Sequence, residues 1–339
     1  MRSLFTRLFR NPHRDEPSAP APAGSGVVTL AGQRIDLAAN ARWHEGIPHP
    51  DWEIVSNVVG AMPASQWQDA ALAADRAWLD WLRGWIGLDY RCFESDVALL
   101  LTTQPERLAQ VKLAYLGTTL RRIERTLEEL ADHGAAGKEL LIAFADEDDY
   151  YRYVSGFYPE EGSFAMSAGM HLGWGRPHFV THGMELEHIE PTIVHEMTHS
   201  CVQHLPLPLW LNEGIAQSVE YRFAPRHRNP REQLELMRKQ SSFWTLDTIQ
   251  QFWSGEAFQL PDAHQEMAYA LALSITDAFA QDWPGFKAFV SQARRDDAGA
   301  GAARKVLGLD LGHYVRLFLE QPDDGDWSPQ PQRWGEPGG

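Results

Sequence analysis

The chain has 339 residues and a formal net charge of −16, from 30 Lys and Arg against 46 Asp and Glu. Because nucleic-acid binding is dominated by cationic contacts to phosphate, this charge argues against a nucleic-acid partner. An apolar fraction of 44% allows a sizeable core, and the length suits two modest domains or one large one.

Cysteine content and hydropathy exclude two further classes of protein. Cys92 and Cys201 are the only cysteines, too few for a disulfide framework or a cysteine-rich zinc module. No stretch approaches the roughly 18 apolar residues that span a bilayer, so we expect no integral membrane segment. Residues 1–10 lack the continuous apolar run of a signal peptide, which predicts a cytoplasmic protein. Their two or three amphipathic turns also allow a weak contact with a membrane surface.

Composition and periodicity divide the chain into four regions. Residues 1–26 end in a Pro/Ala/Gly-rich stretch typical of a disordered linker. Residues 27–135 form a mostly helical N-terminal α+β region. Residues 136–320 carry the functional motifs, and the Pro/Gly/Asp-rich residues 321–339 resemble a disordered tail. The overall prediction is an α+β protein.

The N-terminal region begins with a hairpin and an aromatic helix. Residues 27–37 form two short apolar runs around Ala31 and Gly32, which predicts a small β-hairpin. Residues 63–86 carry apolar side chains at helical spacing, which predicts a helix with one packed face. The residues of this expected face are Trp67, Ala71, Ala74, Trp78, Trp81 and Trp85.

A long helix is predicted between two strands. Residues 97–101 and 138–144 are short apolar runs typical of buried strands. Between them, residues 105–133 show the longest helical periodicity, and Gly134 suits the end of that helix. The side chains expected to face inward are Leu108, Val111, Tyr115, Ile123, Leu127 and Leu130. The acidic residues 146–149 suit the N-terminus of a further helix.

Two strand-like segments, 164–172 and 177–182, follow before the main motif. Each carries histidine: His171, His178 and His182. A histidine on such a strand is more often a hydrogen-bonded polar group than a metal ligand, and we expect that here. After the motif, residues 265–280 predict a strong helix, and residues 286–320 predict two more.

The central motif is His195-Glu196-Met-Thr-His199, within residues 192–201. On a helix, side chains four residues apart lie on one face, so both histidines can reach the same metal ion. Glu196 is turned about 100° from His195, which places its carboxylate beside the metal. Pro191 suits the first turn of this helix. Val194, Met197 and Cys201 lie on another side, which gives the helix a face to bury.

A catalytic zinc ion needs a third protein ligand and an open position for water. Glu213 meets this need, in the segment that follows a turn with Pro206 and Pro208. The two prolines end the first helix, and Asn212 suits the start of the next. The motif therefore predicts one zinc ion per chain, held by His195, His199 and Glu213.

At these residues the chain resembles the gluzincin metallopeptidases, and most closely the bacterial peptidase MA-like group. The resemblance is carried by the HExxH motif and by Trp210-Leu-Asn-Glu213-Gly-Ile-Ala216, which matches W-L-x-E-G-x-A. It implies a zincin-like fold, in which a mixed sheet precedes the HExxH helix and a helical part follows. It also implies zinc on His195, His199 and Glu213, with Glu196 as general base. In zincins the edge strand beside the metal pairs with the substrate, so either 164–172 or 177–182 is expected to do so.

One position departs from the pattern of this family, and another matches it. Several gluzincins place an aspartate four residues after the ligand glutamate to orient a histidine, and here that residue is Gln217. Tyr269 falls where relatives often carry a tyrosine, so it is expected to stabilise the developing oxyanion. The alternative is that Tyr269 packs on the core. His264 is a weaker candidate for the same role.

The expected function is therefore zinc-dependent hydrolysis of peptide bonds in a peptide or protein substrate. Zinc activates a water molecule, and Glu196 takes its proton and passes it to the leaving amine. Three alternatives remain: a zincin-fold protein that binds peptides without cleaving them, a zinc hydrolase of another amide, and a structural protein with an accidental motif. The intact Glu196 argues against a pure binder, which needs no base. The sequence does not indicate an oligomeric state.

Overall fold

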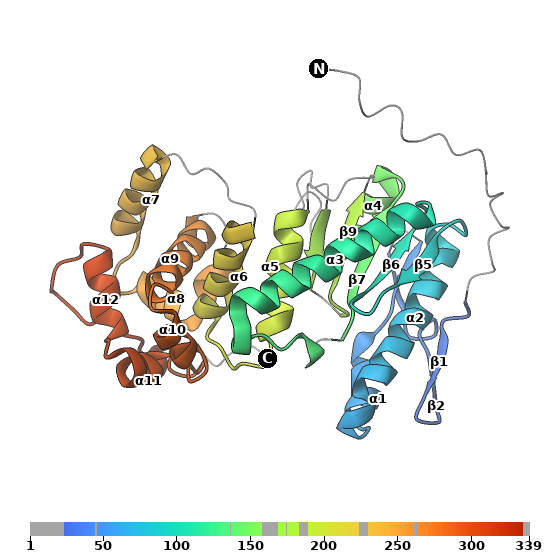
Figure 1. Ribbon diagram of the computed structural model, residues 1–339, viewed down its shortest axis with the longest axis horizontal. Coiled ribbons are helices and arrows are strands. Elements are labelled where there is room, and N and C mark those ends of the chain that lie inside the picture. Colours follow the sequence, from blue (N-terminus) through green and yellow to red (C-terminus); the bar gives the residue numbers. More distant parts are fainter. Residues whose placement is uncertain are drawn as a thin grey trace, which may run out of the picture.

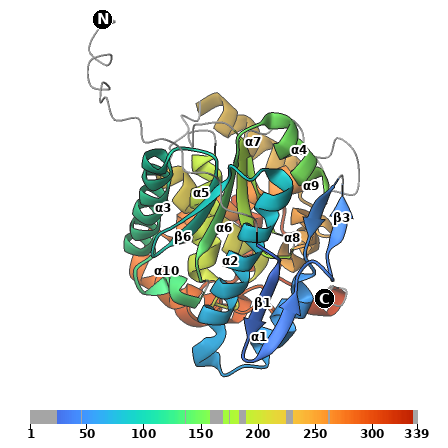
Figure 2. The same cartoon turned by 90° about the vertical axis from the view of Figure 1, so that its right-hand side faces the viewer.

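The computed structural model describes residues 24–44, 46–135, 137–157, 169–173, 175–182, 189–223, 230–260 and 263–334. The expected linker up to residue 23, the membrane-surface contact of residues 1–10 and residues 335–339 lie outside these ranges. The predicted α+β class is confirmed, because a five-stranded mixed sheet packs between helices on its two faces (Figures 1 and 2).

The sheet has the strand order β5-β6-β7-β9-β8. Strands β6 (Ala98–Thr102), β7 (Glu139–Phe144) and β9 (His178–His182) are parallel. β5 (Arg91–Glu94) and β8 (Gly169–Leu172) are antiparallel to their neighbours and form the two edges. The predicted strands at 97–101, 138–144, 164–172 and 177–182 correspond to β6 to β9, and residues 164–168 lie outside the described ranges. Of the two segments beside the motif, β8 is therefore the edge strand.

Both faces of the sheet are buried. Along β6, Ala98 and Leu100 point to one side, and Leu99 and Leu101 point to the other. The same alternation places Phe179 and Val180 of β9 on opposite faces. This two-sided burial explains why the central strands are continuous apolar runs, as is usual for parallel strands covered by helices.

One face is covered by α1 (Trp52–Gly60), α2 (Trp67–Ile86), α4 (Glu147–Ser155) and two hairpins (Figure 2). The predicted hairpin is confirmed as β1 (Val27–Leu30) and β2 (Gln33–Asp36), and β3 (Arg42–His44) pairs with β4 (Ile47–His49). The acidic turn begins a helix as predicted, because Asp146 caps α4 by accepting from the Asp148 backbone N–H. In α2 the central tryptophans are buried, but Trp67 and Trp85 are each 46% exposed.

The other face is covered by α3 (Glu106–Leu127) and α5 (Glu190–Val202). The inward face predicted for the first half of α3 was wrong, because Leu108 is 37% and Val111 is 61% exposed. The buried stripe instead runs through Ala109, Leu113, Leu116, Leu120, Ile123 and Leu127. Leu108 lies one position, or about 100°, out of phase with that stripe.

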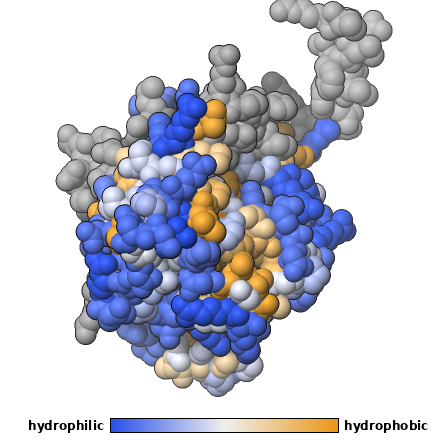
Figure 3. Space-filling model, turned by 90° about the vertical axis from the view of Figure 1, so that its left-hand side faces the viewer, coloured by the Kyte–Doolittle hydropathy of each residue, from blue (hydrophilic) through white to orange (hydrophobic). Residues whose placement is uncertain are grey.

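The C-terminal part is helical and lies at one end of the molecule (Figure 1). It contains α6 (Leu209–Phe223), α7 (Pro230–Phe243), α8 (Thr248–Ser254), α9 (Ala263–Phe279), α10 (Trp283–Val290), α11 (Ala300–Ala302) and α12 (Leu311–Phe318). The helix predicted at 265–280 is α9, and the two predicted beyond residue 286 are α10 and α12. The outer surface of this part is mostly hydrophilic with a few apolar areas (Figure 3).

Two expectations about the regions differ from the structure. The expected boundary between residues 135 and 136 passes between β6 and β7, which are hydrogen-bonded neighbours in one sheet. The expected tail from residue 321 is packed as far as residue 334, since Trp327 is 3% exposed and its carbonyl accepts from Trp253 Nε1 at 2.9 Å. Two tryptophans, Trp327 and Trp334, provide the apolar contacts that the polar composition of this segment concealed.

Within the described ranges, no helix combines the length and the apolar character needed to cross a bilayer.

Candidate metal centre

The two histidines of the motif and Glu213 come from two packed helices. His195 and His199 lie one turn apart on α5, and Glu213 lies in the second turn of α6. Helix α6 begins at Leu209, three residues before the start expected from Asn212. The reason is that the carbonyl of Pro208 already accepts the backbone N–H groups of Leu211 and Asn212.

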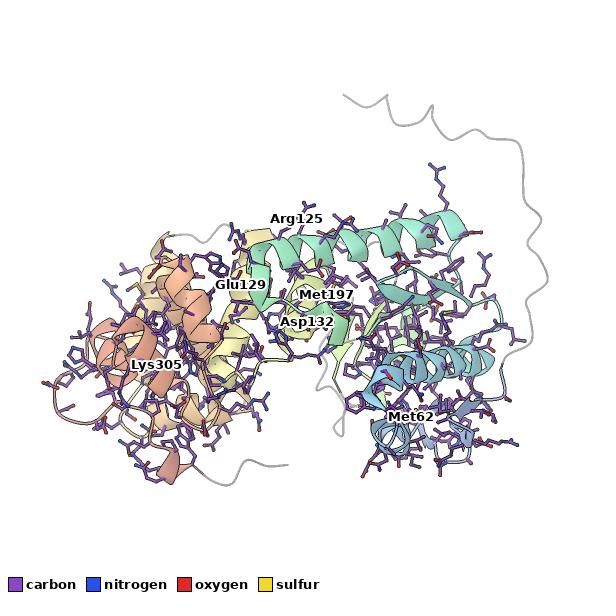
Figure 4. All side chains as sticks on the ribbon, turned by 60° about the horizontal axis from the view of Figure 1, so that its bottom comes forward. Met62, Arg125, Glu129, Asp132, Met197 and Lys305 are labelled. Carbon is purple, nitrogen blue, oxygen red and sulfur yellow. The ribbon has the colours of Figure 1, made fainter. Side chains whose placement is uncertain are left out.

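The side of α5 that is turned away from the two histidines is buried, as predicted, and this burial holds the helix in place. Val194, Met197 and Cys201 are all buried, and Met197 lies near the middle of the molecule beneath α3 (Figure 4). The carbonyl of Cys201 accepts the backbone N–H of Asp132 at 2.7 Å, which ties the end of α5 to the segment after α3. The side of α5 that carries His195 and His199 therefore belongs to a helix anchored in the core.

The donor atoms of the three residues form a compact triangle. The two Nε2 atoms are 3.1 Å apart, and Glu213 Oε2 lies 3.2 Å from His195 Nε2 and 3.5 Å from His199 Nε2. In a tetrahedral zinc site with bonds near 2.05 Å, two ligand atoms are about 3.3 Å apart. Three donors at this spacing fit one tetrahedral ion with a fourth position left for water or substrate. In the described part of the chain, this is the group of His, Cys, Asp and Glu donors close enough to share an ion.

The far nitrogen of each imidazole contacts an oxygen. His195 Nδ1 lies 3.3 Å from Glu220 Oε2, and His199 Nδ1 lies 3.1 Å from Asn212 Oδ1. Because these oxygens accept hydrogen bonds, each Nδ1 carries a proton and each Nε2 directs a lone pair toward Glu213 when the ring is neutral. Such outer partners fix the tautomer and the orientation of metal-binding histidines.

The charges of His195 and Glu213 stabilise each other. Burial opposes the charge on His195, but hydrogen bonds to Glu213 and Glu220 outweigh it and raise the pKa of His195 to about 10. Burial likewise opposes the charge on Glu213, but hydrogen bonds from His195 and His199 lower its pKa to about 2. Without a cation the cluster is thus a network of ion pairs, and binding a metal ion requires His195 to lose its proton.

Glu196 lies beside the triangle and is held by a residue of the edge strand. His171 Nδ1 is 3.1 Å from Glu196 Oε2. Along β8, Met170 and Leu172 pack toward the face that carries α2, so His171 points the other way, against Phe179 and toward α5. Burial raises the pKa of Glu196, but the contact with His171 and the charges of the two motif histidines lower it overall.

A cavity of about 300 Å³ opens at this cluster. Its walls include Thr192, His195, Glu196, Gln217, Glu220 and Tyr221. Gln217, at the position where several gluzincins carry aspartate, therefore lies beside the cluster, but the carboxylate that contacts His195 belongs to Glu220. Glu220 lies about one turn further along α6 than Gln217.

The two remaining predicted residues, Tyr269 and His264, both lie on α9. Burial raises the pKa of the Tyr269 hydroxyl, and the negative charges of Glu213 and Glu196 raise it further. Among the described residues this hydroxyl makes no hydrogen bond, and the Tyr269 ring packs against Phe258 at 5.2 Å. His264 packs on Phe243, a contact within the helical part.

The strand histidines other than His171 are separate from the cluster. His178 is buried on the opposite face of the sheet, where Nδ1 donates to the Arg176 carbonyl and Nε2 accepts from the Tyr153 hydroxyl. His182 packs against Tyr150. Both have the ordinary structural environment expected of strand histidines.

Sequence reasoning missed three residues of the centre: His171 as a partner of Glu196, Asn212 and Glu220. Glu220 had a readable signal, because it follows Glu213 by seven residues, or two helical turns, and so shares its face. Asn212 and His171 had no such signal in the sequence, because their contacts depend on how α6 and β8 pack against α5.

No protein-family model matches this chain, and no curated protein matches it either.

Proposed function

We propose that this protein is a zinc-dependent metallopeptidase of the gluzincin type. The proposal is carried by one observation: three donors from His195, His199 and Glu213 form a triangle of tetrahedral dimensions, with the carboxylate of Glu196 beside it. Two imidazoles and one carboxylate with an open fourth position are the donor set of catalytic zinc sites.

Each residue has a distinct part in the proposed reaction. His195, His199 and Glu213 would hold the ion, and bound zinc would supply the Lewis acidity that makes water reactive near neutral pH. Glu196 accepts the proton of the attacking water and passes it to the amine that leaves. Glu220 and Asn212 hold the two imidazoles, and His171 holds the Glu196 carboxylate. The hydroxyl of Tyr269, which makes no hydrogen bond among the described residues, is the proposed donor for the developing oxyanion.

The edge strand favours a peptide over other amides as the substrate. β8 has β9 on one side and no further strand in the described sheet on the other. An extended peptide can add to such an edge through backbone hydrogen bonds. His171 ties β8 directly to Glu196, so a peptide aligned on this strand is brought to the base.

The first test measures zinc per chain in the wild type and in Glu213→Ala, with Glu124→Ala on the exposed side of α3 as the matched control. We expect about one zinc in the wild type and the control, and a clear loss in Glu213→Ala, because two ligands hold zinc poorly. Equal zinc in all three proteins would remove Glu213 from the centre. Absence of zinc from the wild type after incubation with the metal would contradict the proposal.

The second test separates catalysis from binding. Glu196→Gln removes the base and leaves the three ligands, so zinc content should stay the same while cleavage of a mixed peptide library falls about 10²- to 10⁴-fold. Cleavage at the wild-type rate would exclude Glu196 as the base. Zinc-loaded wild type that binds peptides and leaves them intact would favour a peptide-binding protein instead.

A further inference from the structure

Two half-exposed tryptophans meet on the surface near the end of α2. Trp43 of β3 is 50% exposed and Trp85 of α2 is 46% exposed, and their rings touch edge to face with centroids 4.6 Å apart. The buried Trp81 lies beneath, 6.3 Å from Trp43. We call Trp43 and Trp85 the tryptophan patch. Single apolar side chains on a surface are ordinary, but large ones that gather there mark a place where another segment or molecule binds.

The described part of the chain begins beside the tryptophan patch. Strand β1 packs along α2, on the side of the molecule that faces the viewer in Figure 2. Just before β1, the Gly24 backbone N–H donates to the Asp80 carbonyl at 3.2 Å. Gly26 lies directly against Trp81, since a Cβ atom there would come within 2.9 Å of the ring. Residues 1–23 are therefore joined to the fold next to the patch.

Residues 1–10 are complementary to this surface in apolar character and in charge. Four apolar side chains recur at a spacing of four, which places them on one side of a helix. They are Leu4, Phe5, Leu8 and Phe9. The same ten residues contain three arginines and no acidic residue, in a chain of net charge −16. At the end of α2 the exposed acids are Asp80 and Asp89, against the exposed Arg42 of β3.

The length of the connecting chain allows residues 1–10 to reach the tryptophan patch. Between Arg10 and Gly24 the chain spans up to about 45 Å when extended, because each residue adds about 3.3 Å. The patch itself lies close to Gly24, so a fraction of this reach is enough. A segment tethered in this way has an effective concentration on the order of 1 mM. An intrinsic affinity in the millimolar range is therefore sufficient for docking.

We propose that residues 1–10 dock onto the tryptophan patch of the same chain, with their apolar side against Trp43 and Trp85. An amphipathic segment with arginines also suits a membrane surface, but the net charge of −16 opposes the approach of this protein to anionic lipid. Docking within the chain covers the two tryptophans and brings the arginines toward acidic protein surface. The inference is independent of the proposed peptidase activity, since it involves the other face of the sheet.

The test places a bimane fluorophore on Phe9→Cys of the full-length chain, in a Cys92→Ser background. Cys201 is fully buried and escapes labelling. Tryptophan quenches bimane only near contact, so docking quenches the label. Replacing both patch tryptophans, by Trp43→Phe and Trp85→Phe together, keeps apolar rings and removes the quenchers. We expect the fluorescence of the label to rise at least twofold.

Trp67→Phe is the matched control for the patch. Trp67 is also 46% exposed, but it lies at the other end of α2, roughly 27 Å away along the helix axis. The fluorescence of this variant should equal that of the labelled parent chain.

A second set of variants changes the docking segment. Leu4→Ser, Phe5→Ser and Leu8→Ser, combined in the labelled chain, remove the apolar side and should raise the fluorescence as much as the loss of both tryptophans. Thr6→Ser, on the other side of the segment, is its control and should leave the fluorescence unchanged. Because docking is intramolecular, the quenching should not vary between about 0.1 and 10 µM protein.

Three results would overturn the proposal. Equal fluorescence with and without the patch tryptophans would show that residues 1–10 do not contact them. Quenching that deepens with protein concentration would assign the contact to a second copy of the chain. An unquenched label whose emission shifts to the blue on addition of phosphatidylcholine–phosphatidylserine vesicles would identify residues 1–10 as a membrane contact instead.

Discussion

The histidines on the two sides of the sheet differ in what their ring nitrogens contact. His195 and His199 each place Nδ1 against an oxygen and leave Nε2 facing a second ligand. His178 has both nitrogens occupied, one by a carbonyl and one by a hydroxyl. A neutral imidazole has one donor and one acceptor, so His178 has no lone pair left to offer a metal, whereas His195 gains one at Nε2 when it loses its proton. The contacts of the ring nitrogens, more than the residue type, therefore distinguish the histidines proposed to bind a metal from the structural one.

His171 provides a prediction at the residue scale. His171→Ala removes the contact to Glu196, so we expect kcat to fall about tenfold with little change in KM or zinc content, because the base loses its orientation. His171→Gln retains an N–H donor and should recover part of the loss. The exposed His204→Ala is the control. If the Ala and Gln variants both matched wild-type kcat, Glu196 would not depend on His171.

At the scale of elements, the site depends on how closely α6 packs against α5 and α9. Gly214 follows Glu213, a proposed metal ligand, and faces α9. A Cβ atom at Gly214 would lie 2.8 Å from the Ala272 carbonyl oxygen and would also overlap the Thr276 side chain. The close packing of α6 against α9 therefore explains why the residue after Glu213 is a glycine.

This packing predicts opposite effects for two glycine substitutions. Glycine to alanine in a helix ordinarily stabilises a protein by about 0.5–1 kcal/mol. Gly117→Ala on α3 should do so, because the nearest atom to its Cβ would be 3.4 Å away. Gly214→Ala should instead destabilise by about 1–3 kcal/mol, since α9 must move away. Denaturant unfolding of the two variants measures both effects, and a stabilised Gly214→Ala would refute the packing argument.

At the scale of the whole molecule, the last described segment closes the helical part. The Gln250 side-chain oxygen accepts from the Gln330 backbone N–H at 2.9 Å and from Trp334 Nε1 at 3.2 Å. Together with buried Trp327, these contacts hold residues 321–334 on α8. The segment is therefore part of the fold.

Truncation tests this role. Ending the chain after residue 320 removes the Trp327 and Trp334 side chains, so we expect the free energy of unfolding to fall by about 2–4 kcal/mol. Ending it after residue 334 removes none of these contacts and is the control. Thermal unfolding of both chains gives the comparison. Equal midpoints would show that the segment adds nothing to stability.

The buried His178 predicts how the stability of the whole molecule varies with pH. Burial lowers the pKa of His178 from 6.5 to about 3. Below pH 6.5 the unfolded chain binds a proton that the folded chain does not, so stability is complete above about pH 6.5 and declines as the pH falls toward 3. His178 alone should cost about 2 kcal/mol between pH 7 and pH 5.

Urea unfolding at several pH values measures this dependence. In His178→Gln the decline between pH 7 and pH 5 should be smaller by about that amount, even if the variant is less stable at pH 7. Parallel curves for the wild type and His178→Gln would show that another group causes the acid sensitivity.

The sequence by itself determined the features that depend on neighbours along the chain. Helical spacing placed His195 and His199 on one face, and short apolar runs located β6, β7 and β9. Both are local, because a few residues set the period of a helix or a strand. The pairing of Glu213 with the histidines was also within reach, since only a short turn separates the two helices.

Only the tertiary structure decided the features that depend on contacts between distant segments. These are the buried face of α3, the choice of β8 as the edge strand, the contact of His171 with Glu196 and the packed segment 321–334. Amphipathic periodicity restricts a helix to a few possible faces, but the partner selects one. In the same way, a histidine becomes a structural group, a metal ligand or the partner of a base according to the side chains that folding brings to its ring.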